Sequence, residues 1–199
     1  MRTAAILAGG RATRFGGRDK SALVVGDRTI LDRQIAMLSA VDGVDEILIV
    51  GNATHPSART IADVVPGCGP LGGIHAALTG ATHDTVFVLA CDTPYPTASL
   101  VAHLLSLADG VDVVVPHTEQ GYHPLCAVYT RGCLEPIAQR LAAGRLKVLD
   151  LADDVRARVV SGGELERFGD PHQLFTNVNT PADYALCRQR PAAVHDHEL

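Results

Sequence analysis

Residues 3–20 decide the fold of this chain, and they read TAAILAGGRATRFGGRDK. The first six residues are apolar or β-branched and predict a buried strand, which runs directly into a pair of glycines. A second glycine pair and four cations follow within residues 11–20. Glycines allow positive φ angles and let bare N–H groups approach phosphate oxygens, so this loop is predicted to hold a triphosphate.

The loop differs from two common phosphate-binding motifs. It lacks the G-x-G-x-x-G spacing of a dinucleotide fold, and Lys20 follows Asp19 rather than the glycine of a Walker A loop. A surface hairpin would account for the glycines alone, but it accounts less well for Arg14 and Lys20 directly after a buried strand. Lys20 is one of two lysines in a chain that otherwise uses arginine, and its ammonium is a compact point charge.

The composition excludes several classes of function. A net charge of −5 over 199 residues argues against a general nucleic-acid-binding protein, which needs a broad basic surface. Four tyrosines, four phenylalanines and no tryptophan are too few for a base-stacking platform. No apolar run approaches the roughly 20 residues of a membrane span, and five cysteines without a C-x-x-C pair fit small buried thiols better than disulfides or zinc. We expect a cytoplasmic protein with no membrane or nucleic-acid partner.

Strand-like and helix-like patterns alternate along the chain. Apolar, β-branched runs predict strands at residues 3–8, 46–50, 85–90, 111–115, 124–129 and 157–160. Helical spacing of apolar residues predicts helices at residues 32–41, 72–78, 97–107, 131–143, 146–153 and 181–190. The alternation predicts an α/β fold with a mostly parallel central sheet and helices on both faces, in one domain over residues 1–190 with a flexible tail over 191–199. Ligands of such sheets bind beyond the carboxyl ends of the strands, which points to residues from Gly9 onward and from Cys91 onward.

Asp92 follows the strand at 85–90, within the sequence Cys91-Asp92-Thr93-Pro94-Tyr95. A carboxylate at the exit of a buried strand is well placed to hold Mg²⁺, which prefers oxygen ligands and keeps several waters. A turn or helix-capping role for the same aspartate is also open, because Pro94 enforces a turn here.

Two further segments have distinctive patterns. Asn177 and Asn179 lie on one face if their segment is extended, where an amide could bind a metal or a substrate. Thr180 suits the N-cap of a helix that begins at Pro181. Residues 67–73 read GCGPLGG, a turn that either brings the backbone close to a base or ribose or simply connects a strand to a helix.

Taken in order, these segments resemble the molybdenum cofactor guanylyltransferases over residues 7–184. The matching motifs are residues 7–20, 69–73, 91–95 and 177–181. The resemblance implies a Rossmann-like nucleotidyltransferase fold, with GTP as the nucleotide, Mg²⁺ as the metal and molybdopterin as the acceptor. Gly10 and the residues around Asp92 favour the guanylyl branch over its cytidylyl relatives.

The resemblance also implies roles for individual residues. Lys20 and Arg14 would offset charge on the triphosphate, and Asp92 would bind both Mg²⁺ and the nucleotide. Asn177 and Asn179 would lie near the acceptor. The remaining nucleotide contacts that it implies are Leu7, Ala8 and Gly9 through their backbone, Gly10, Asp63 and, after the second strand, Asn52.

In the implied reaction, the terminal phosphate of molybdopterin or Mo-molybdopterin attacks the α-phosphorus of GTP, and pyrophosphate leaves. No general base is needed because this phosphate is already an anion. Two alternatives stay open: another nucleotidyl transfer, with CTP or a sugar-phosphate acceptor, and a non-catalytic GTP-binding module. The presence of Asp92 and Lys20 weighs against the module. The product would pass to molybdenum cofactor biosynthesis proteins or to apo-molybdoenzymes.

Overall fold

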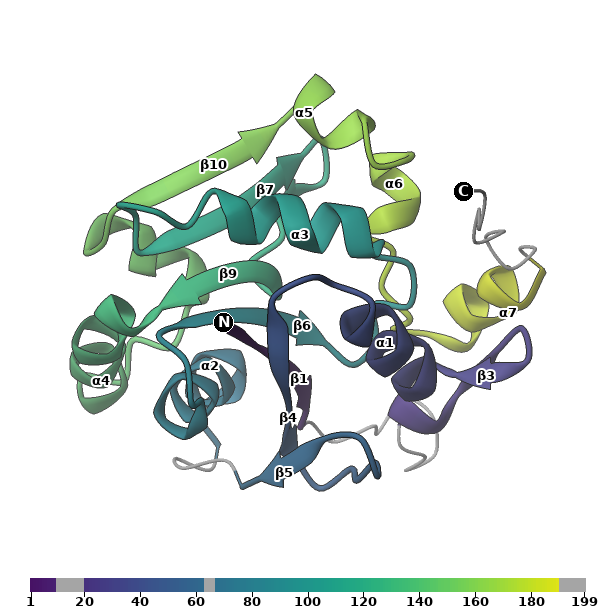
Figure 1. Cartoon of the computed structure of the whole chain (residues 1–199), viewed down its shortest axis with the longest axis horizontal. Helices are drawn as coiled ribbons and strands as arrows, with labels where there is room; N and C mark the ends of the chain where they lie inside the picture. The colour runs from purple at the N-terminus through teal and green to yellow at the C-terminus, as the bar shows by residue number, and fades with distance from the viewer. Residues whose placement is uncertain (10–19, 63–66, 190–199) are drawn as a thin grey trace.

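The computed structural model describes residues 1–9, 20–62 and 67–189 (Figure 1). Its main feature is an eight-stranded sheet in the order β10-β7-β9-β6-β1-β4-β5, with β8 paired to β7. The strands of this sheet are β1 (Arg2–Ala8), β4 (Val44–Gly51), β5 (Arg59–Ile61), β6 (Thr85–Ala90), β7 (Val113–Thr118), β8 (Gly121–Tyr122), β9 (Cys126–Thr130) and β10 (Ala157–Ser161).

Helices cover both faces of the sheet, as the sequence predicts. Helices α1 (Ile30–Ser39) and α3 (Ala98–Ser106) pack on one face, and α2 (Gly69–Gly80) and α4 (Leu134–Ala142) pack on the other (Figure 1). The remaining elements are η2 (Lys20–Ala22), the β2 (Val24–Val25) and β3 (Arg28–Thr29) hairpin, η3 (Arg131–Cys133), η4 (Val148–Asp153), α5 (Gly163–Glu166), α6 (Pro171–Leu174) and α7 (Pro181–Gln189).

The first strand is buried on both faces. Ala4 and Ile6 belong to the core cluster that contains α1 and α3, whereas Ala5 and Leu7 belong to the cluster that contains α2. Side chains alternate between the two faces of a strand, so a strand covered on both sides needs an apolar residue at every position. This explains why the sequence after Thr3 is an unbroken apolar run.

Strand β9 departs from the parallel arrangement. Strand β1 pairs in parallel with β4 and β6, whereas β9 pairs antiparallel with β6 and β7. The chain turns back from β7 into β8 and reaches β9 through residues 123–125. The His123 N–H donates to the Pro116 carbonyl (2.9 Å) and the Ala90 N–H donates to the Leu125 carbonyl (2.8 Å), so this short connection is held next to the carboxyl end of β6.

Most predicted elements are present with shifted ends. The helix expected over residues 146–153 is a 3₁₀ helix over Val148–Asp153, and the strand expected from residue 124 begins at Cys126. The sequence patterns missed β2, β3, β5, β8, α5 and α6. Each of these has at most four residues, which is too short to display a helical or strand period.

A smaller core cluster joins α7 to the β2–β3 hairpin, through Val25, Ile30, Val178 and Cys187.

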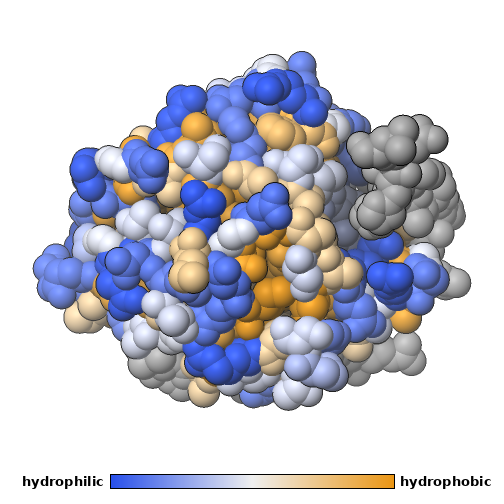
Figure 2. All heavy atoms as spheres, in the orientation of Figure 1, coloured by the Kyte–Doolittle hydropathy of each residue, from blue (hydrophilic) through white to orange (hydrophobic). Residues whose placement is uncertain are grey.

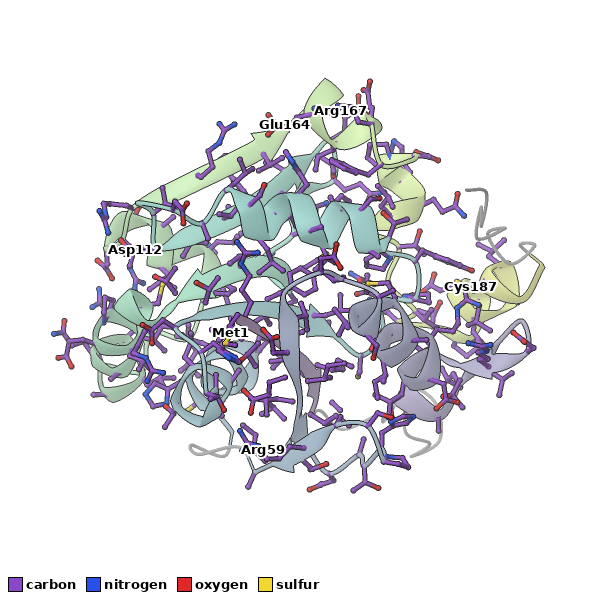
Figure 3. All side chains as sticks on the ribbon, in the orientation of Figure 1. Met1, Arg59, Asp112, Glu164, Arg167 and Cys187 are labelled. Carbon is purple, nitrogen blue, oxygen red and sulfur yellow. The ribbon has the colours of Figure 1, made fainter. Side chains whose placement is uncertain are left out.

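Cys187 and Asp112 lie on opposite sides of the molecule (Figure 3). Hydrophilic residues cover most of the face in Figure 2, with a group of hydrophobic residues near its centre. Within the described residues, no helix has the length and apolar character that crossing a membrane requires.

Candidate active site

A cavity of about 1170 Å³ lies beyond the carboxyl ends of β1, β4 and β6. The chain runs from β1 to β4 and β5 on one side and returns to β6 on the other side of β1. The cavity therefore lies at the topological switch of the sheet, where ligands of open α/β sheets bind. Gly9, which follows β1, and Cys91, which follows β6, both line this cavity.

The end of β1 forms the first wall of the cavity. Leu7, Ala8 and Gly9 line it, and Ala8 pairs with Gly51 at the end of β4. Gly51 has a φ of +131°, and a Cβ at this position would lie 2.6 Å from the Ala8 carbonyl oxygen. Because Gly51 has no side chain, the Ala8–Gly9 peptide can lie beside the cavity in the space that a Cβ would occupy.

The start of α2 forms the adjoining wall. Gly67, Gly69 and Pro70 line the cavity there, together with Asn52 from the segment after β4. The unpaired N–H groups at the start of a helix favour anionic ligands. The glycine-rich turn thus begins a helix and also brings its backbone to the cavity, so both interpretations of residues 67–73 fit the structure.

Asp92 lies in the turn after β6 and lines the cavity. The Thr93 N–H donates to the Ala90 carbonyl (3.2 Å), and the Asp92 carbonyl accepts a hydrogen bond from the Val178 N–H (2.8 Å). The Thr93 hydroxyl donates to Asn177 Oδ1 over 2.8 Å. These contacts hold the Asp92 turn against residues 177–178, which lie far from it in sequence.

Asn177 and Asn179 line the same cavity on either side of the fully buried Val178. The alternation is that expected of an extended segment. The Asp183 N–H donates to Thr180 Oγ1 (3.1 Å), and the Asp183 carboxylate accepts from the N–H groups of Thr180 (2.8 Å) and Asn179 (3.0 Å). Thr180 is therefore the N-cap that the sequence predicts, and the cap also fixes the backbone at Asn179.

Another wall consists of residues that the sequence patterns did not single out: Tyr122, His123, Pro124 and Phe175. His123 stacks on Phe175 with ring centroids 4.1 Å apart, and its Nε2 lies 2.8 Å from Thr118 Oγ1. Burial, and to a lesser degree the nearby His117, lower the pKa of His123 from 6.5 to about 4, so this imidazole is neutral near pH 7. Its place depends on the pairing of β7 with β8, which no local pattern reveals.

Four of the expected site residues lie wholly or partly outside the described residues. Gly10, Arg14 and Asp63 lie outside the described residues, and so does the side chain of Lys20, whose backbone begins η2. Among the described residues that line the cavity, Asp92 is the one Asp, Glu, Lys or Arg.

The oxygen donors that line the cavity around Asp92 fit a hard divalent cation that keeps several waters. Over residues 1–9, 20–62 and 67–189, no group of three or more His, Cys, Asp or Glu side chains could hold a metal ion. A single carboxylate near amide oxygens suits an ion that keeps waters and takes further oxygens from a nucleotide. The set is a poor match for zinc, which takes three or four nitrogen, sulfur or carboxylate ligands from the protein.

Three comparisons show which known proteins the chain resembles. The family model described as "MobA-like NTP transferase domain" matches residues 4–156. A probable molybdenum cofactor guanylyltransferase from Pelotomaculum thermopropionicum is 38% identical over 94% of this chain and 91% of its own length. A molybdenum cofactor guanylyltransferase from Desulfosudis oleivorans is 36% identical over 89% and 90%. The crystal structure of molybdopterin-guanine dinucleotide biosynthesis protein A from Archaeoglobus fulgidus superposes with a TM-score of 0.80, at 22% identity over 94% of this chain and 96% of its own.

Proposed function

The chain belongs to the family of MobA-like NTP transferase domains, and we propose that it transfers GMP from GTP to the terminal phosphate of molybdopterin or Mo-molybdopterin. It is a nucleotidyltransferase, and the relatives that it matches over nearly their whole length are named for guanylyl transfer. The observation that carries the proposal is the cavity itself. It joins the end of β1, the Asp92 turn and the Asn177–Asn179 segment at one edge of the sheet.

We propose that the nucleotide lies along the wall made by β1 and the start of α2. Leu7, Ala8 and Gly9 line this wall, and a Cβ on Gly67 or Gly69 near the start of α2 would meet no atom within 4 Å, which leaves room for a bound ligand. Arg14 and Lys20 would neutralise the triphosphate from the loop that follows β1.

Asp92 would hold Mg²⁺, with the amides of Asn177 and Asn179 close by. When bound, the ion would supply charge neutralisation for the phosphates of GTP. The acceptor would lie on the side of Tyr122, His123 and the two asparagines. Its phosphate oxygen forms the new bond to the α-phosphorus, and the bond from that phosphorus to the departing pyrophosphate breaks. The neutral His123 and the two amides would orient the acceptor by hydrogen bonds without adding charge.

Two other functions share this geometry. A cytidylyl transfer would use the same cavity, because CTP and GTP share the same ribose and triphosphate groups. A non-catalytic GTP-binding module would keep the fold without turnover. We place the guanylyl transfer first because of the named relatives. We place it in the cytoplasm because none of the five cysteines, all of which the structure describes, forms a disulfide.

One experiment tests the function. The purified chain is given molybdopterin, Mg²⁺ and either GTP, CTP or ATP, and pyrophosphate release is measured. We expect release with GTP and at least about tenfold slower release with CTP or ATP, the scale of discrimination that one or two base contacts provide. Faster release with CTP would identify a cytidylyltransferase, and binding of GTP without release in the presence of acceptor would identify a binding module.

The matched variants are Asp92→Asn and Asp84→Asn. Asp92→Asn removes the carboxylate that we assign to the metal, and we expect pyrophosphate release to fall by at least about 100-fold. Asp84 is exposed, pairs with Arg131 at the amino end of β6 and does not line the cavity. Its asparagine variant should retain wild-type release. Wild-type turnover in Asp92→Asn would refute the metal assignment.

A further inference from the structure

Gln34 is a buried amide that reaches from α1 to the turn carrying Asp92. Its residue is 1% exposed. Its Nε2 donates to the Ala90 carbonyl (2.7 Å) and to the Thr93 carbonyl (2.9 Å), so both amide hydrogens of Gln34 are used. The two carbonyls belong to the residues on either side of Cys91 and Asp92. One side chain therefore holds both ends of the segment that presents the carboxylate.

The same turn is held from two other directions. The Cys91 N–H donates to the Leu7 carbonyl (3.2 Å), and the Val178 N–H donates to the Asp92 carbonyl (2.8 Å). Thus β1 and the segment before α7 each contribute a backbone hydrogen bond. Gln34 differs from these because it acts through a side chain, so the contact can be removed without altering the backbone of either partner.

The amide of Gln34 carries a free-energy cost, which comes from its oxygen. Gln34 Oε1 is buried and has no hydrogen-bond partner among the described residues. A buried polar atom without a partner destabilises the folded state, and an apolar side chain of the same length would avoid this cost. The two hydrogen bonds to the Asp92 turn offset it. A side chain that served only to fill space in α1 would not need them.

We propose that Gln34 is a positioning residue for the reaction. By holding the carbonyls of Ala90 and Thr93, it fixes the Asp92 turn and thereby the carboxylate assigned to the metal and triphosphate. The proposal rests on the function proposed above for Asp92. Residues that orient a metal ligand through a hydrogen bond commonly change metal affinity or activity by roughly 10- to 100-fold when replaced.

Gln34→Met tests this role, because methionine has a similar length and lacks the two N–H donors. Amide hydrogen exchange of the metal-free protein gives a readout independent of activity. We expect the amides of residues 91–93 to exchange at least about tenfold faster in Gln34→Met, while amides in β4 are unchanged. In turnover assays, we expect the Mg²⁺ concentration for half-maximal activity to rise about tenfold, with little change in the KM for the acceptor.

Thr3→Val is the matched control. Thr3 is fully buried, and its hydroxyl donates to Glu46 Oε2 (2.8 Å) at the amino end of β1, away from the cavity. This variant also replaces a buried polar side chain by an apolar one. It should lower the stability of the fold without changing the Mg²⁺ dependence or the exchange at residues 91–93.

Wild-type exchange at residues 91–93 in a folded Gln34→Met would overturn the proposal. If Gln34→Met does not fold, measurements on Gln34→Glu and on the wild-type protein test the proposal instead. Gln34→Glu loses at least one of the two N–H donors in either protonation state, so exchange at residues 91–93 should be faster, and the Mg²⁺ requirement higher, than in wild type. In wild type, the side-chain amide protons of Gln34 should exchange at least about tenfold slower than those of the exposed Gln139, and equal rates would count against the contacts.

The failure of the proposed function would look different. If the wild-type chain releases no pyrophosphate from any nucleotide, the assignment of Asp92 to a metal–triphosphate site fails. The exchange experiment on the metal-free protein would still report whether Gln34 fixes the turn.

Discussion

His123 illustrates how the surroundings of one residue set its chemistry. Its ring is packed against Phe175 on one side and is close to His117 and the Thr118 hydroxyl. Burial comes first among the causes that lower the pKa of His123 to about 4, and the neighbouring His117 adds to it. A neutral imidazole can accept or donate a hydrogen bond near pH 7, which suits the recognition of an uncharged heterocycle better than the binding of a phosphate.

The first prediction at this scale concerns acid stability. The folded pKa of His123 is depressed below its unfolded value of 6.5, so its stabilising contribution is complete above pH 6.5 and is lost as the pH falls toward 4. In His123→Gln, the free energy of unfolding should therefore vary less between pH 6.5 and pH 4 than in wild type. Urea unfolding at several pH values measures this difference.

A direct titration of the ring by NMR supplies the control for that prediction. A His123 pKa near 4 would agree with the structure, whereas a value near 6.5 would show that the ring is exposed in solution. His172 is 60% exposed in its side chain and provides an internal comparison in the same spectrum.

The ends of β1 and β4 form a unit, because the two strands pair in register up to Ala8 and Gly51. Gly51 lies in a region of φ that favours glycine, and the Ala8–Gly9 peptide occupies the space that a Cβ would fill. The loop that follows β1 therefore starts from a peptide whose position is set by a neighbouring strand. A glycine also allows α2 to pack closely on β1, because a Cβ on Gly73 would lie 3.3 Å from the Leu7 side chain.

A prediction at this scale follows for Gly51→Ala. The new Cβ would strain the backbone and displace the Ala8–Gly9 peptide, so we expect the Kd for GTP to rise by about tenfold or more. Gly110→Ala is the matched control. Gly110 also has a positive φ (+75°), but a Cβ there would meet no atom within 4 Å, and the residue has no place in the cavity wall. Both variants should lose stability, and only Gly51→Ala should lose affinity. Equal GTP binding by the two would contradict the positioning role of Gly51.

Across the whole molecule, the carboxyl ends and the amino ends of the strands have different roles. The cavity lies at the carboxyl ends of β1, β4 and β6, whereas Glu46 joins several elements near the amino ends of these strands. Its carboxylate accepts hydrogen bonds from Arg59 on β5 (2.5 Å), the Thr3 hydroxyl on β1 (2.8 Å) and the Thr82 N–H (2.8 Å); Figure 3 labels Arg59. Burial alone would raise the pKa of Glu46, but the hydrogen bonds from Thr82, Arg59 and Thr3 outweigh it and lower the pKa from 4.5 to about 2.

The prediction at this scale separates stability from function. A carboxyl whose folded pKa is lowered stabilises the fold above its unfolded pKa, and this contribution is lost as the pH falls from 4.5 toward 2. Glu46→Gln should therefore be less stable than wild type at pH 7, and the difference should shrink below pH 4. Its KM for GTP at pH 7 should be unchanged, because Glu46 does not line the cavity. An altered KM for GTP would show that the amino and carboxyl ends of the strands are energetically coupled.

Local sequence patterns were enough to predict the alternation of strands and helices, the glycine-rich segment after β1, the carboxylate after β6 and the capped helix at Thr180. These features are local, since each depends on the spacing of residues within one element or at its end. The ordered motifs also identified the family, which the comparisons confirm.

The tertiary structure alone decided the remaining features of the site. Gln34 reaches carbonyls 56 and 59 residues away, Thr93 meets Asn177 across 84 residues, and Gly51 meets Ala8 through strand pairing. His123 reaches the cavity because β7 turns back into β8 before the chain enters β9. No local pattern specifies such contacts, because they arise when hydrophobic burial on both faces of the sheet brings distant segments to one edge.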